Sequence, residues 1–79
     1  MPGFEEIVLA SKKLHTCNIV YEKNDGSIVS HEIFGYSLRE GDLMGFRVDV
    51  GEIRRFKIDR IIDAVDSGNT FVPEYPVEL

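Results

Sequence analysis

Short runs in which apolar and polar residues alternate make up most of the chain. The run HTCNIVYE places Cys17, Ile19 and Tyr21 on one face, and the run RRFKI does the same for Phe56 and Ile58. A period of two residues is typical of strands that bury one face. The pattern therefore predicts a mainly β protein.

The run LMGFRVDV alternates in the same way and predicts a half-buried strand over residues 43–50. Its apolar side chains are expected on the core face: Met44, Phe46, Val48 and Val50. Arg47 and Asp49 are expected on the opposite, solvent face.

The run from Ile28 to Phe34 is less regular. Val29, His31 and Ile33 point one way, while Ile28 and Phe34 point the other, which is typical of a strand that twists or bulges in a small barrel. Phe34 and Tyr36 are interpreted as exposed aromatic side chains.

Glycine-containing turns separate these runs. Asn24-Asp25-Gly26 lies between two β-rich runs and predicts a hairpin, because glycine tolerates the positive φ that such turns need. Further breaks are expected at residues 40–42, at Gly51 and at residues 67–69. About five short strands result.

The two ends of the chain differ from its middle. Glu5 and Glu6 precede Lys12 and Lys13, a charge order that suits the helix dipole, so a helix is expected over about residues 4–14. Pro73 and Pro76 cannot donate to a strand ladder, so residues 73–79 are expected to form a tail. A short sheet must curl to bury its apolar face, which favours a small barrel over residues 15–72.

Length and composition restrict the class of protein. A chain of 79 residues can form one core, so residues 1–79 are predicted to be a single domain. The lone Cys17 excludes an intramolecular disulfide and favours a reducing compartment, so a cytoplasmic location is expected. The apolar runs are too short for a membrane helix and the N-terminal residues do not resemble a signal peptide, so no membrane association is expected.

Charge is distributed unevenly along the chain. The net charge is −5, which argues against nonspecific binding to polyanions over the whole surface. Residues 39–60 nevertheless carry six Lys/Arg and five Asp/Glu, whereas the rest of the chain carries three Lys/Arg and nine Asp/Glu. The centre of the sequence is therefore the place to look for an anion site.

The stretch RRFKIDRI resembles the signature of the WYL domain family. The residues that match are Arg54, Phe56, Lys57, Ile58, Asp59, Arg60 and Ile61. Looser similarity is seen at Ile19–Tyr21 with Asp25-Gly26 and at Leu43–Phe46, so the resemblance covers about residues 5–70. The family's Trp and Tyr fall at Gly41 and Asp42, and only Leu43 of the name-giving residues remains.

The resemblance implies an Sm-like or SH3-like β-barrel of about five antiparallel strands, preceded by a helix. It also implies a regulatory domain that senses nucleic acids or nucleotide-like ligands beside transcription regulators or nucleic-acid-processing systems. The family's proline in the second strand corresponds to Gly35, and the arginine four residues before it to His31. No helix-turn-helix is expected within these 79 residues, so a regulatory role would depend on association with a partner.

Arg54 and Arg60 are the main candidates for contacts to an anionic ligand. They alternate with Phe56 and so flank an apolar stripe, and a guanidinium can grip a phosphate with two parallel hydrogen bonds. The alternative is that they pair with Asp59, Asp49 or Asp63.

Three further basic residues are candidates for a supporting role. Arg47, Arg55 and Lys57 are expected to form a basic strip on the solvent face beside this site, with a plain solvated face as the alternative.

No catalytic or cofactor motif is found in the sequence. His15, Cys17 and His31 lack the spacing of a metal site, and no nucleophile elbow, glycine-rich phosphate loop or paired catalytic carboxylate stands out. A noncatalytic protein without metal or cofactor is therefore expected. The leading hypothesis is a ligand-sensing domain that binds a nucleotide or single-stranded nucleic acid. The alternatives are a protein-interaction or oligomerisation module, and a family member that has lost its ligand site.

Overall fold

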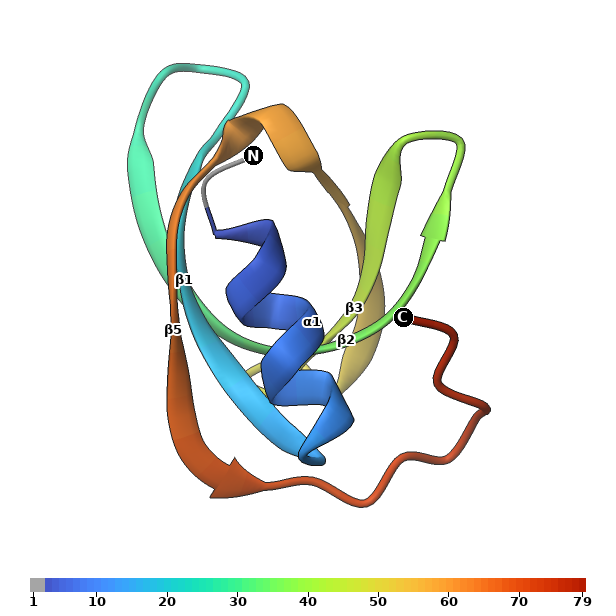
Figure 1. Ribbon diagram of the computed structural model, residues 1–79. Helices are drawn as coiled ribbons and strands as arrows, with labels where there is room; N and C mark the ends of the chain where they lie inside the picture. Colours follow the sequence, from blue (N-terminus) through green and yellow to red (C-terminus); the bar gives the residue numbers. More distant parts are fainter. Residues whose placement is uncertain (1–2) are drawn as a thin grey trace.

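The computed structural model describes residues 3–79 as one curved antiparallel sheet with a helix packed against it (Figure 1). The elements follow in the order α1 (Phe4–Lys12), β1 (His15–Glu22), β2 (Ile28–Arg39), β3 (Asp42–Arg47), β4 (Glu52–Lys57), the 3₁₀ helix η1 (Ile58–Arg60) and β5 (Ile61–Thr70). The order of strands across the sheet is β4-β3-β2-β1-β5. The mainly β fold with five antiparallel strands and an N-terminal helix is therefore confirmed.

The sheet is open in the described part of the chain. β4 and β5 form its two edges and are joined through η1, without a ladder between them. The expected closure into a barrel is not seen. Curvature alone brings the inner face together around its core.

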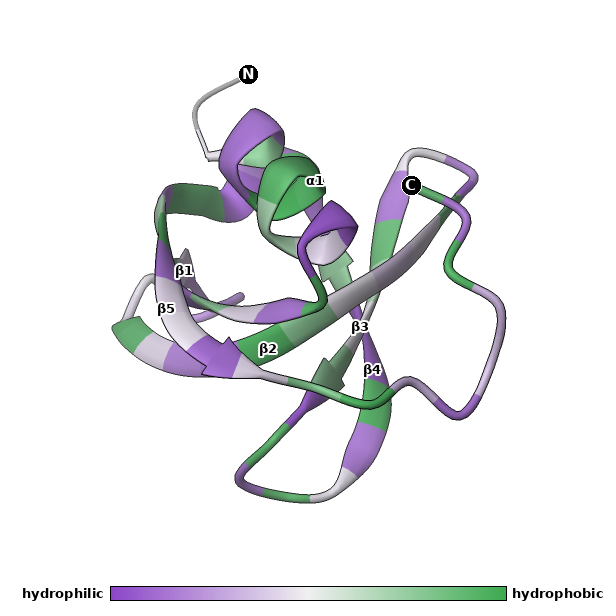
Figure 2. Ribbon diagram, turned by 60° about the horizontal axis from the view of Figure 1, so that its bottom comes forward, coloured by the Kyte–Doolittle hydropathy of each residue, from purple (hydrophilic) through white to green (hydrophobic). Residues whose placement is uncertain are grey.

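The inner face of the sheet carries the hydrophobic core. Buried side chains of α1, the strands and η1 form one cluster: Ile7, Ala10, Cys17, Ile19, Ile33, Leu43, Phe56, Ile58, Ile61 and Ala64. α1 lies over β1, β2 and β5, and β3 and β4 extend beyond it (Figure 2). One part of the inner face is therefore covered by the helix, and the part formed by β3 and β4 is not.

Gly35 explains how closely α1 approaches the sheet. A Cβ atom at this position would lie 2.7 Å from Cγ2 of Ile7 and 2.9 Å from Cδ1 of Leu79. The hydroxyl of Ser11 donates a hydrogen bond of 2.9 Å to the carbonyl of Gly35. Only glycine leaves room for the helix here, at the position where the WYL resemblance expects proline.

Two boundaries differ from the sequence-based prediction. The helix ends at Lys12 instead of residue 14, because Leu14 has a left-handed backbone with φ 59°. The predicted break at residues 67–69 lies inside β5, where Gly68 has φ 79° and donates its N–H to Oδ1 of Asp66. The turn residues distort this strand without ending it.

The core face of β3 is opposite to the predicted one. Leu43 is fully buried, whereas Met44 and Phe46 lie half-buried on the outer face. Val48 and Val50 are not in the strand at all: the N–H of Gly51 donates to the carbonyl of Arg47 and closes a turn between β3 and β4. Val48 and Val50 in the turn extended the alternating pattern beyond the strand, so the pattern assigned Met44 and Phe46 to the core face instead of Leu43.

The segment after β5 packs against the sheet instead of forming the predicted tail. Phe71 stacks on Phe34 with ring centroids 4.5 Å apart, and Leu79 contacts the core. Between them, the N–H of Glu78 donates to the carbonyl of Tyr36 at 2.7 Å. The segment therefore buries Phe34 and Tyr36, which had been interpreted as exposed.

Candidate functional site

A pocket of about 650 Å³ opens on the part of the inner face that α1 leaves uncovered. We call it the inner pocket. Its walls come from the end of β1, the β1–β2 turn, β2, β3 and β4. The lining residues are Tyr21, Lys23, Asn24, Asp25, Val29, His31, Arg47, Arg54, Arg55 and Phe56. Four of these ten side chains are cationic and one is a carboxylate, so the lining favours an anion.

The strand register explains why Arg47 and Arg54 share this pocket. In the β3–β4 pair Arg47 lies opposite Glu52, and Gly45 lies opposite Arg54. Residues opposite each other project from the same face of a sheet, and Gly45 faces the core. The expectation that Arg47 joins Arg55 and Lys57 on the solvent face is therefore wrong, because it followed from the reversed assignment of β3.

Both arginines pair with an acidic residue two positions away. Arg47 donates from Nε and Nη2 to Asp49 at 3.0 and 2.6 Å. Arg54 donates from Nε and Nη2 to one oxygen of Glu52 at 3.1 and 2.8 Å. Both carboxylates are more than half exposed. Exposed ion pairs contribute little free energy, about 0–1 kcal/mol, so a bound anion can replace them at small cost.

Arg60 lies beside the inner pocket and is not among its lining residues. Its Nη1 donates a hydrogen bond of 3.2 Å to the backbone carbonyl of Lys23. This contact ties η1 to the end of the β1–β2 hairpin. In this conformation Arg60 binds a backbone carbonyl and does not line the pocket together with Arg54. It forms no ion pair with Asp49, Asp59 or Asp63, the partners proposed from the sequence.

Arg55 and Lys57 project from the outer face, as the alternation in β4 predicts. Arg55 pairs with Asp42 at 3.1 Å and its side chain is half exposed. Lys57 is exposed. Arg55 borders the inner pocket, whereas Lys57 lies outside it.

Aromatic rings form the floor of the inner pocket. The rings of Tyr21 and Phe56 meet edge to face at 5.3 Å, and His31 lies 6.1 Å from Phe56. Burial lowers the pKa of His31, and the positive charge of Arg47 lowers it further, so the imidazole is neutral at pH 7. The pocket therefore combines aromatic rings with the cationic side chains of Lys23, Arg47 and Arg54.

Lys23, Tyr21 and His31 were not identified as site residues from the sequence. Their signal is the strand pairing, since Tyr21 lies opposite Val29 and Ile19 opposite His31 in the β1–β2 hairpin. In this register Tyr21, Val29 and His31 all project from the inner face and line the pocket. The turn at Asp25-Gly26, which was predicted, fixes that register: Oδ1 of Asp25 accepts the N–H of Ser27 at 2.9 Å.

The candidates for metal or nucleophile chemistry, His15, Cys17 and His31, do not form a joint site. Cys17 is buried, which raises the pKa of its thiol to about 12. His15 pairs with Asp66 at 3.1 Å, and His31 lies in the inner pocket. Within residues 3–79 no three such side chains cluster in a way that would hold a metal ion.

Comparisons with known proteins give one informative result. No family model and no curated protein matches the chain. Among solved structures, the proteasome accessory factor B/C (PafBC) of Arthrobacter aurescens matches with a TM-score of 0.73 at 15% identity. The match covers 92% of this chain and 13% of PafBC, so the chain corresponds to a small part of that protein. At this identity the likeness shows a shared fold alone, which agrees with the WYL-like fold expected from the sequence.

The α-helix α1 spans nine residues, Phe4–Lys12. In residues 3–79 no helix is long and apolar enough to cross a bilayer.

Proposed function

We propose that this protein is a noncatalytic, regulatory ligand-sensing domain that binds a nucleotide or single-stranded nucleic acid in the inner pocket. The observation that carries the proposal is the joint placement of Lys23, Arg47 and Arg54 around an aromatic floor. Guanidinium groups suit phosphate oxygens, and aromatic side chains stack on bases with about 1–3 kcal/mol each. The similarity to part of PafBC and the WYL-like RRFKIDRI stretch support a role in transcriptional or nucleic-acid-processing regulation.

The contribution of each basic residue differs in this proposal. Arg54 and Arg47 contact phosphate after releasing Glu52 and Asp49, and Lys23 adds charge from the hairpin turn. Arg55 supports the rim. Arg60 positions Lys23 through its hydrogen bond to the Lys23 carbonyl. Lys57 lies outside the pocket and contributes only to the positive electrostatic potential around it.

Fluorescence anisotropy with a labelled oligothymidylate of about eight nucleotides tests the proposal. The expected result is saturable binding that weakens steeply between about 50 and 200 mM salt, because phosphate contacts release counterions. Arg54→Ala should weaken binding about tenfold or more, since a charge-assisted contact is lost. Arg39→Ala removes the same type of side chain outside the inner pocket and serves as the control.

Two outcomes of this titration contradict the proposal. One is the absence of saturable binding below millimolar concentration at low salt. The other is equal weakening by Arg54→Ala and Arg39→Ala, because the oligonucleotide would then respond to net charge and not to the pocket. Circular dichroism of each variant establishes that the fold is retained.

A second candidate function is oligomerisation through the edge strand β5. This edge is unpaired in the sheet, and Ile62 and Val65 on β5 are about half exposed. β4 is the less suitable edge, because charged side chains on an edge strand oppose pairing. Light scattering after size exclusion tests this function: a dimer that Val65→Lys converts to a monomer supports it, and a wild-type monomer at about 0.1 mM contradicts it.

A further inference from the structure

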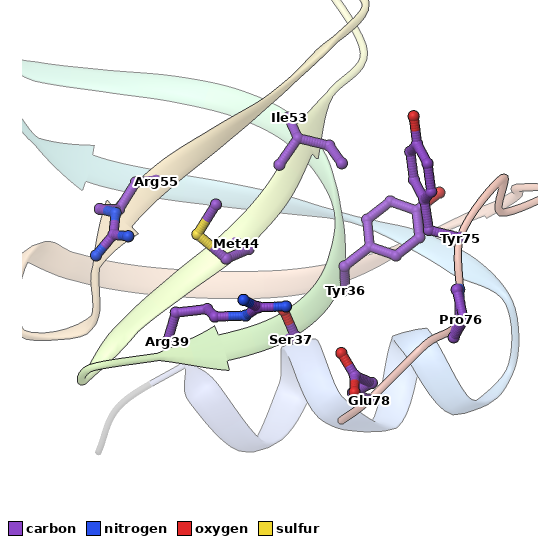
Figure 3. Close-up of a pocket in the computed structure, with 9 residues that line it drawn as sticks. All are labelled: Tyr36, Ser37, Arg39, Met44, Ile53, Arg55, Tyr75, Pro76 and Glu78. Carbon is purple, nitrogen blue, oxygen red and sulfur yellow. The ribbon is translucent and has the colours of Figure 1, made fainter.

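A second pocket, of about 470 Å³, lies on the outer face of the sheet (Figure 3). We call it the outer pocket. Its apolar part is formed by Met44 and Ile53 on neighbouring strands and by the rings of Tyr36 and Tyr75. These two rings meet at 5.9 Å, with Tyr75 projecting into solvent from the C-terminal segment. The volume is typical of sites for small molecules.

A β-bulge brings two arginines to this pocket. Gly35 lies opposite Gly45, but the next paired residue is Ser37, opposite Met44, so Tyr36 is the extra residue. Because a shift of one residue reverses the faces of a strand, Arg39 projects from the outer face instead of the inner one. There it lines the outer pocket together with Arg55 (Figure 3).

The two arginines differ in their partners. Arg55 pairs with Asp42 at 3.1 Å. Arg39 has no carboxylate within ion-pairing distance among residues 3–79. Arg39 therefore offers an unengaged guanidinium beside an apolar floor, an arrangement that suits a carboxylate attached to an apolar body.

The C-terminal segment forms the opposite wall and limits the charge that fits. It is held by two hydrogen bonds to Tyr36: the N–H of Glu78 donates to its carbonyl, and the N–H of Glu74 donates to its phenol oxygen at 3.0 Å. The Glu78 side chain lines the same pocket. Its carboxylate repels a second negative charge, so a polyphosphate or oligonucleotide is disfavoured here.

From this arrangement we infer that the outer pocket binds a small amphipathic anion with an aromatic body and a single carboxylate. The aromatic body lies against Met44, Ile53 and Tyr75, and the carboxylate pairs with Arg39. This site is separate from the inner pocket, and the two pockets share only Arg55 among their lining residues.

Titration with naphthoate, followed by ¹H–¹⁵N spectra of the full chain, tests the inference. We expect saturable shifts of Tyr36, Arg39 and Tyr75 with a Kd below about 1 mM. Naphthylmethanol, which has the same ring system without the charge, should bind about tenfold more weakly. Arg39→Ala should remove this difference between the two probes, whereas Arg54→Ala should leave it unchanged.

The inference is overturned by any of three results. Naphthoate causes no saturable shifts at concentrations up to about 5 mM; naphthoate and naphthylmethanol bind equally to the unmodified protein; or the shifts map to the inner pocket and disappear in Arg54→Ala. Arg39 is exposed, so Arg39→Ala should fold, and the spectra themselves report this. Failure here leaves the oligonucleotide proposal unaffected, because that proposal depends on Arg54.

Discussion

The phenol oxygen of Tyr21 accepts a hydrogen bond of 2.9 Å from the backbone N–H of Lys57. Tyr21 lies near the end of β1, and Lys57 is the last residue of the edge strand β4. β1 and β4 are not neighbours in the sheet. This one bond therefore joins strands that the ladder leaves apart, at the margin of the inner pocket.

We expect Tyr21→Phe to lower the free energy of unfolding by about 1 kcal/mol, the usual contribution of one hydrogen bond. The ring remains against Phe56, so only the bond is lost. Urea unfolding measures the change. Tyr75→Phe is the control, because the Tyr75 hydroxyl has no hydrogen-bond partner within residues 3–79, and a loss of equal size in both variants would contradict the account.

Phe71 should account for much of the stability that the C-terminal segment provides. Its ring stacks on Phe34 and lies 5.1 Å from Phe46. Because the ring is only partly buried, we expect Phe71→Ala to destabilise the fold by about 2 kcal/mol, less than a fully buried phenylalanine. The neighbouring Val72 is 87% exposed, so Val72→Ala should leave the unfolding midpoint nearly unchanged. Equal midpoints for the two variants would show that the stacking contributes nothing.

Alternation predicted the parts of the fold where strands are regular. Cys17, Ile19 and Phe56 are buried on their strands as expected, and the turn at Asp25-Gly26 forms the β1–β2 hairpin. Ile58 is also buried, although it lies in η1 instead of the expected strand. The inner face could be followed this far because the β1–β2 and β3–β4 pairs each keep one register along their length.

The remaining features depend on contacts that the sequence pattern does not contain. The bulge at Tyr36 changes which face Arg39 occupies, and the valines of the β3–β4 turn imitate a longer strand. The C-terminal segment has prolines typical of a tail, yet Phe71 and Leu79 find apolar partners on distant strands. For the same reason the sequence pointed to Asp49, Asp59 or Asp63 as partners of Arg54, whereas its carboxylate partner in the structure is Glu52.

Cys17 is expected to be unreactive in the folded protein. The thiol is buried, which raises its pKa to about 12, so very little thiolate forms at pH 8. We expect labelling by Ellman's reagent to be at least about 100-fold slower than in urea-unfolded protein. Lys12→Cys adds an exposed thiol on α1 and should label at once, by one equivalent. Fast labelling of two thiols in that variant would contradict the burial of Cys17.

Oligothymidylate binding should become tighter as pH falls below about 6.5, the ordinary pKa of histidine. Burial and Arg47 hold the pKa of His31 below that value in the free protein, although Asp49 lies 3.9 Å away. A bound anion favours the protonated imidazole and raises its pKa, so the complex takes up a proton. The affinity should rise by up to about tenfold for each unit by which this pKa rises.

The pH dependence has a direct control, because phosphodiesters do not titrate in this range. His31→Asn should retain binding at pH 7 and lose the increase at lower pH. The stability of the free protein depends on pH in the opposite direction. Below about pH 6.5 the unfolded state binds more protons at His31 than the folded state does, so acid lowers the free energy of unfolding. Affinity that is independent of pH in the unmodified protein would argue against an anion beside His31.

Chemical-shift mapping with an oligothymidylate of about four nucleotides tests the central claim most directly, because it locates the ligand without assuming a residue. The account predicts saturable shifts concentrated at Tyr21, Lys23, His31, Arg47 and Arg54, with little change in the C-terminal segment. Shifts confined to the outer pocket, or spread evenly over all basic residues, would contradict it.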